Sequence, residues 1–222
     1  MAMPFTTEQF FEVFLRYNLD TAPAPVILYL VAAFLVALAL RDDPTSDRWI
    51  AGILAFLWAW MGVVYHWIFF AHINPAAWIF GALFVLQAGM FLWAGMARDR
   101  LSIRFRADAY GLAGATLILY GLAVYPVLGA LAGHGFPEGP TFGLPCPTTI
   151  VTFGLLLWAR PRVPVHVVVM PALWSLVGAN AALRLGVPED LGLLVAGVLG
   201  TVLILARNRR AATQSAKEAV AA

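Results

Sequence analysis

The chain alternates between long apolar runs and short polar loops. A run of about 20 apolar residues can cross the roughly 30 Å hydrocarbon core of a bilayer as one helix. The pattern predicts seven such helices, at residues 23–40, 49–70, 76–97, 109–132, 148–159, 163–183 and 188–206. We therefore predict an all-α fold, a polytopic membrane helix bundle with about seven transmembrane helices.

A different pattern precedes the first apolar run, where residues 6–18 read as an amphipathic helix. Thr6 and Gln9 fit a capping box at its start. Aromatic and aliphatic residues cover most of its surface, and the charges recur every four positions, at Glu8, Glu12 and Arg16. We expect this helix to lie in the membrane interface as an anchor, with its aromatic face towards lipid. The alternative is a lid over a site that opens outwards.

The composition supports a membrane protein. Of the 222 residues, 62% are hydrophobic and 12% are charged, whereas soluble domains keep roughly a quarter of their residues charged. We expect three parts: an N-terminal interfacial helix within residues 1–22, one helix-bundle domain over residues 23–206, and a basic, disordered cytoplasmic tail over residues 207–222. The basic residues are scattered between apolar runs, which argues against nucleic-acid binding.

The basic residues predict the orientation, because loops rich in Lys and Arg stay inside. One side of the predicted bundle carries only Arg16 and Arg184. The other side carries twelve of the fourteen basic residues, namely Arg41, Arg48, Arg98, Arg100, Arg104, Arg106, Arg160, Arg162, Arg207, Arg209, Arg210 and Lys217. The N-terminus is predicted outside and the C-terminus inside.

The segment before the fifth predicted helix is unusual. Residues 133–147 contain four glycines and four prolines, so they cannot form a regular helix. The run 148–159 would be about 18 Å long at 1.5 Å per residue, which is short for a bilayer. We expect the preceding segment to dip inwards and build a pocket, since irregular backbone at that depth must be buried or line a wet cavity.

Cys146 would then stand at a helix start, beside the hydroxyls of Thr148 and Thr149. The positive end of a helix dipole favours a thiolate or a bound anion, although a lone cysteine is often an inert packing residue. His66, His72 and His134 are predicted on the same outer side. We take Cys146, His66, His134, Thr148, Thr149 and His72 as the candidate solute-binding residues.

Several activities are excluded. The only lysine is Lys217, outside the bundle, so no retinal Schiff base can form. No charged residue lies near the middle of a predicted span, which disfavours proton pumps and voltage sensors. Histidine and cysteine could bind Zn²⁺ or copper, but their spacing shows no HxxxH or CxxC pair. The sequence identifies no cofactor.

Four stretches resemble a known family: PFTTEQFFEVFLRYN, LWAWMGVVYHWIFFAHINPAA, PTFGLPCPTTIVTFGLLLWA and GVPEDLGLLVAG. They look like an uncharacterised bacterial multi-pass membrane family that is classified as a domain of unknown function. The resemblance covers residues 3–205. It implies the bacterial inner membrane and implies no activity, cofactor or site residue.

These features lead us to expect a small inner-membrane transporter or solute-binding membrane protein, with an outward-facing pocket at the broken-helix loop 133–149. Its partners would be the lipid bilayer and a small solute. One alternative is a membrane metalloprotein or thiol enzyme that uses Cys146 and the outer histidines. Another is an accessory subunit of a larger membrane complex. The residues favour a protein that is not an enzyme without deciding the matter.

Overall fold

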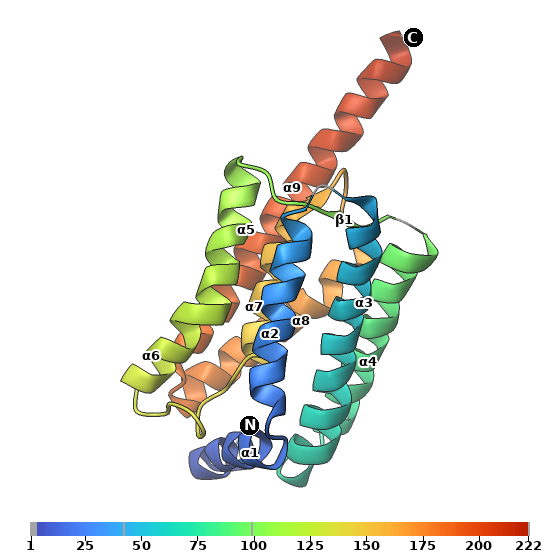
Figure 1. Ribbon diagram of the computed structural model, residues 1–222. Helices are drawn as coiled ribbons and strands as arrows, with labels where there is room; N and C mark the ends of the chain where they lie inside the picture. The colour runs from blue at the N-terminus through green and yellow to red at the C-terminus, as the bar shows by residue number, and fades with distance from the viewer. Residues whose placement is uncertain (1–3, 42, 99, 222) are drawn as a thin grey trace.

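The computed structural model describes residues 4–41, 43–98 and 100–221, so parts of the predicted N-terminal segment and tail, residues 1–3 and 222, lie outside it. The chain is an all-α helix bundle, as predicted (Figure 1). Its elements in chain order are α1 (Thr7–Asp20), α2 (Ala24–Ala39), α3 (Pro44–Trp60), η1 (Met61–Phe69), η2 (Phe70–His72), α4 (Ala77–Leu92), η3 (Trp93–Ala97), β1 (Ser102–Ile103), α5 (Ala109–Leu119), η4 (Tyr120–Val124), α6 (Tyr125–Leu131), α7 (Pro145–Trp158), β2 (Ala159–Arg160), α8 (His166–Leu185), η5 (Pro188–Asp190) and α9 (Leu191–Ala221).

Every apolar run of the sequence is helical. Five helices in the described residues are long and apolar enough to cross a membrane, with bounds Pro44–His72, Ala77–Ala97, Ala109–Leu131, His166–Leu185 and Pro188–Gln214. A sixth candidate combines α1 and α2, which meet at an 83° bend, and α7 is a shorter apolar helix. The chain is thus built as a membrane protein, while the count of seven spans stays a prediction.

Three of the long helices contain π-helical turns: η1 continues α3, η3 continues α4 and η4 continues α5. π-helical turns inside α-helices are frequent at functional sites. In η1 the wider turn buries two neighbouring side chains, Tyr65 and His66, at 3% and 0% exposure.

Helix α1 confirms the predicted capping box between Thr6 and Gln9. Its aromatic face, however, packs on protein instead of lipid, because the bend before α2 folds α1 across the end of the bundle (Figure 1). Phe10, Phe14 and Tyr17 are 8%, 4% and 0% exposed, within an aromatic cluster that also includes residues of η1 and η2. Helix α1 therefore covers one end of the bundle, while its place in a membrane interface stays a prediction.

Helix α7, the short fifth segment, lies in the middle of the bundle. Thirteen of its fourteen residues are buried, and it packs against α5, η4, α8 and α9. Small residues permit the closest approach: a Cβ added at Gly114 of α5 would lie 2.5 Å from the main-chain oxygen of Gly154 in α7. Because neighbouring helices surround α7, its short length leaves no backbone facing lipid.

The predicted disordered tail is instead helical. Helix α9 continues to Ala221 and extends beyond the bundle (Figure 1). Residues 207–222 include six alanines and three arginines, and both residue types favour helix. Extending an existing helix also avoids the cost of nucleation.

The two ends of the bundle differ in character. One end, which we call the covered end, holds α1, η2, the end of α6 and η5 (Figure 1). The opposite end, the arginine end, holds the β1–β2 pair, the start of α5 and the departure of α9. There Ser102 pairs with Arg160 and Ile103 with Ala159.

Candidate functional site

A cavity of about 440 Å³ lies inside the covered end, a size within the range of small-molecule sites. Its walls come from α1, the η1–η2 region, the loop before α7, the middle of α8 and η5. The lining is mostly aromatic and aliphatic, and consists of Phe5, Phe10, Phe14, Tyr65, Phe70, Asn74, Phe80, Pro140, Leu144, Pro145, Cys146, Trp174, Leu176, Val177, Gly178, Asn180 and Asp190.

One carboxyl group, that of Asp190, lines this cavity beside the Cys146 thiol. Asp190 is 4% exposed, and its Oδ1 accepts a hydrogen bond from the Tyr125 hydroxyl at 2.5 Å. The carboxyl group also interacts with the thiol of Cys146. No described Lys or Arg forms an ion pair with it. An acidic group inside an apolar bundle is costly, which makes Asp190 a candidate site residue.

The preceding residue, Glu189, is also buried, with 0% exposure. Its Oε1 lies 2.8 Å from Nε2 of His134, and its main-chain oxygen accepts a hydrogen bond from the Tyr120 hydroxyl at 2.7 Å. Its second carboxylate oxygen has no hydrogen-bond partner in the described residues. The His134 ring also packs against Phe11 of α1, with ring centroids 4.8 Å apart. The η5 turn thus directs two acidic side chains towards two different groups of partners.

His66 lies behind the cavity wall, completely buried. Its ring contacts five aromatic rings, and the centroids of Phe84 and Trp174 are 4.7 and 5.1 Å away. Neither ring nitrogen has a hydrogen-bond partner in the described part of the chain. Leaving both unbonded in an apolar surrounding costs free energy. His66 is therefore an unsatisfied polar group next to the lining residues Tyr65, Phe70 and Phe80.

The loop before α7 is folded into the protein, with residues 139–145 all buried. Asn18 of α1 holds it through three hydrogen bonds. Its Nδ2 donates to the main-chain oxygens of Pro137 at 2.7 Å and Gly139 at 2.9 Å. Its Oδ1 accepts a hydrogen bond from the Thr141 hydroxyl at 2.8 Å. Hydrogen bonds thus join helix α1 to the loop, and both segments contribute residues to the cavity wall.

Helix α7 begins at Pro145, three residues before the predicted start, and Cys146 is its second residue. The chain turns into the helix at Gly143, whose φ of 99° suits glycine. The main-chain N–H of Gly143 donates to Oγ1 of Thr148 at 2.9 Å. Thr148 therefore stabilises the turn, while the buried hydroxyl of Thr149 has no partner in the described residues.

The structure brings together some of the sequence-predicted residues. Cys146 lines the cavity. His66 and His134 do not line it: His66 contacts the lining residue Trp174, and His134 contacts Glu189. His72 is separate: it is exposed and lines a shallow groove with Glu12 and Arg16 of α1. The hypothesis that these side chains bind a solute stays a prediction.

A model of a family of unknown function, DUF6064, matches residues 7–215. The chain belongs to the DUF6064 family. This confirms the resemblance to a family of that kind. No curated protein and no solved structure matches the chain.

Sequence reasoning missed the acidic pair of this DUF6064 protein. Glu189 and Asp190 follow Pro188 at the start of a helix. The helix dipole favours acidic residues there, so their position alone explains why they are acidic. The sequence did offer one signal for a functional site: two acidic residues stand side by side next to a predicted span, in a chain that has few charges. Tyr125 and Trp174 carried no signal, because aromatic residues are common in the apolar runs.

The metalloprotein alternative requires several metal-binding side chains close together in this DUF6064 protein. Within residues 4–41, 43–98 and 100–221, no group of three His, Cys, Asp or Glu side chains could hold a metal ion. His66 belongs to η1, His72 to η2 and His134 to the loop after α6.

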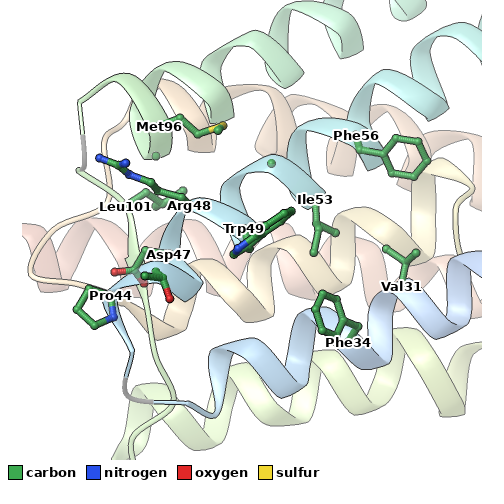
Figure 2. Close-up of a pocket in the computed structure, with 13 residues that line it drawn as sticks. Val31, Phe34, Pro44, Asp47, Arg48, Trp49, Ile53, Phe56, Met96 and Leu101 are labelled. Atoms are coloured by element: carbon green, nitrogen blue, oxygen red, sulfur yellow. The ribbon is translucent and has the colours of Figure 1, made fainter.

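A larger cavity, of about 950 Å³, lies elsewhere in the DUF6064 bundle, between α2, α3 and η3 (Figure 2). Phe34, Trp49 and Phe56 line it and are 52%, 65% and 48% exposed. Figure 2 shows Asp47 and Arg48 at its end towards the α2–α3 connection. Its walls thus include large apolar side chains that are about half exposed, whereas the aromatic walls of the smaller cavity include the buried side chains of Phe10, Phe14 and Tyr65. The smaller cavity differs from it in holding a buried carboxyl group, that of Asp190, together with the Cys146 thiol.

Proposed function

We propose that this DUF6064 protein is a small solute-binding membrane protein with a transport role, and that its solute occupies the cavity at the covered end. The observation that carries the proposal is the pairing of Cys146 and Asp190 in a cavity otherwise walled by aromatic and aliphatic side chains. Ligand sites typically combine an apolar surface with a few converging polar groups.

The surroundings favour one class of solute. Asp190 is the acidic residue of the lining, and its carboxyl group accepts hydrogen bonds. Seven of the lining residues are Phe, Tyr or Trp. Aromatic faces and a carboxylate together suit a small organic cation or a hydrogen-bond donor with an apolar body.

We further propose that the covered end faces outwards from the bacterial inner membrane. The excess of basic residues at the opposite end supports this orientation. Helix α1 would then act as the outer cover of the site, since Phe10 and Phe14 form part of the cavity wall.

Labelling of Cys146, the single cysteine of the chain, tests the proposal. In intact cells an impermeant maleimide should label it, and small organic amines that bind should protect it. Asp190→Asn should remove the protection, whereas Glu138→Gln, the same chemical change at an exposed loop residue, should retain it. Labelling by permeant reagents alone would refute the outward opening. Failure of every amine to protect Cys146 in the wild-type protein would refute the solute class.

A further inference from the structure

A further cavity, of about 580 Å³, lies at the arginine end, whereas the proposed solute cavity lies at the covered end. Three segments form it: the stretch after β1, the β2 turn and the part of α9 that leaves the bundle. Half of its lining residues are arginines and none is acidic, the set being Ser102, Arg106, Arg160, Pro161, Arg207, Arg210, Ala211 and Gln214.

Arg207 is a fixed part of this cavity. It is 7% exposed, and its guanidinium donates to the main-chain oxygens of Leu157 at 2.7 Å and Leu156 at 3.1 Å. These are carbonyls of the last turn of α7, which a helix end otherwise leaves unbonded. The guanidinium also lies 5.3 Å from the Tyr110 ring. Its Nε is buried and has no hydrogen-bond partner in the described residues.

The cavity keeps an excess of positive charge. Among the ion pairs of the described residues, one involves its lining, that of Arg160 with Asp108. Four arginines and one aspartate leave a formal charge of +3 around the cavity. Arg106 and Arg210 are exposed, so their side chains can turn towards a ligand.

The depth of the cavity identifies the ligand. Residues 191–206 of α9 hold no charge and span about 24 Å at 1.5 Å per residue. Arg207 therefore comes where the chain leaves a hydrocarbon core of about 30 Å, which is the level of the lipid phosphates. Guanidinium groups bind phosphate oxygens in paired hydrogen bonds. Basic pockets between membrane helices bind anionic headgroups in this way.

We propose that this cavity binds the phosphate of an anionic phospholipid headgroup, with Arg207 as the fixed cation and Arg106 and Arg210 closing around it. A free phosphate offers the same chemistry. The depth of Arg207 and the adjoining apolar part of α9 favour the lipid, whose chains would run along that helix.

Native mass spectrometry of the purified protein in detergent tests this, with phosphatidylglycerol and phosphatidylcholine titrated in parallel. The wild type should retain phosphatidylglycerol more tightly. The double variant Arg106→Gln, Arg210→Gln should bind phosphatidylglycerol about 30-fold more weakly. This factor assumes that each of the two arginines contributes the binding free energy that is typical of a basic residue near an anionic membrane surface. The control Arg162→Gln, Arg209→Gln removes the same charge from exposed residues outside the lining and should bind like the wild type.

Two outcomes would overturn the proposal. Equal weakening in both double variants would mean that the arginine end attracts anionic lipid through its overall charge and not through this cavity. The second outcome concerns inorganic phosphate. If phosphatidylglycerol and phosphatidylcholine bind alike, and inorganic phosphate binds more weakly to the Arg106→Gln, Arg210→Gln variant than to the wild type, the cavity binds a soluble ligand and not a lipid. Unchanged melting temperatures of both variants show that the fold is intact.

Discussion

Replacing Asn18 by Ala tests whether α1 is fastened as a cover over the solute cavity. The substitution removes the three hydrogen bonds that join α1 to the loop before α7, those to Pro137, Gly139 and Thr141. Asn18 is 1% exposed, so water does not readily replace the lost partners. Two main-chain oxygens and one hydroxyl are left without their partner.

The expected magnitude follows from these contacts. A hydrogen bond contributes a net of about 1 kcal/mol, and a buried group left unsatisfied costs as much or more. Three bonds therefore amount to about 3 kcal/mol between α1 and the loop. At 1.4 kcal/mol for each tenfold change, this corresponds to roughly a 150-fold larger population of the open cover.

Hydrogen–deuterium exchange measures this local opening directly. In Asn18→Ala, protection should fall in α1 and in residues 137–144 while α7 stays protected, and maleimide labelling of Cys146 should accelerate. Arg16→Ala is the control, because its ion pair with Glu12 is 68% and 52% exposed and such pairs contribute little. If the loop of Asn18→Ala exchanged at the same rate as the loop of the wild type, the reasoning would be refuted, since the hydrogen bonds would then not hold the cover.

Three further predictions concern the bundle. Gly143→Ala should lower the melting temperature through about 1–3 kcal/mol of strain, because φ is 99° there; an unchanged melting temperature would contradict the strained turn. Gly114→Val should destabilise the protein far more than Gly52→Val, because a Cβ at Gly114 meets a main-chain oxygen at 2.5 Å and one at Gly52 meets nothing within 4 Å; equal melting curves would contradict the close helix approach. The pKa of Asp108 is held below its usual value by a backbone N–H of α5 and then by the Arg160 guanidinium. The ionised Asp108 side chain therefore stabilises the fold above the unfolded pKa of about 4, and this stabilisation is lost as the pH falls through the lower folded pKa. Asp108→Asn should therefore show a smaller loss of melting temperature between pH 6 and pH 3 than the wild type, and identical pH profiles would contradict this.

The local elements followed from the residues themselves. Apolar runs of sufficient length predicted every membrane-type helix, and the Thr6–Gln9 capping box predicted the start of α1. These features depend on neighbouring residues in the chain, so sequence pattern and backbone hydrogen bonding decide them. The gathering of Gly and Pro over residues 133–147 likewise indicated the break before α7.

Only the tertiary structure decided which side chains meet. The sequence marked Cys146 as a candidate, but its partner Asp190 lies 44 residues away and belongs to a turn whose acids already had a local explanation. The same holds for α1, whose aromatic face would suit lipid or protein equally well until the 83° bend places it on the bundle. An apolar surface specifies burial without specifying what buries it, because the hydrophobic effect is non-directional. Contacts across the bundle depend on how the helices pack, and no local pattern in this single chain encodes that.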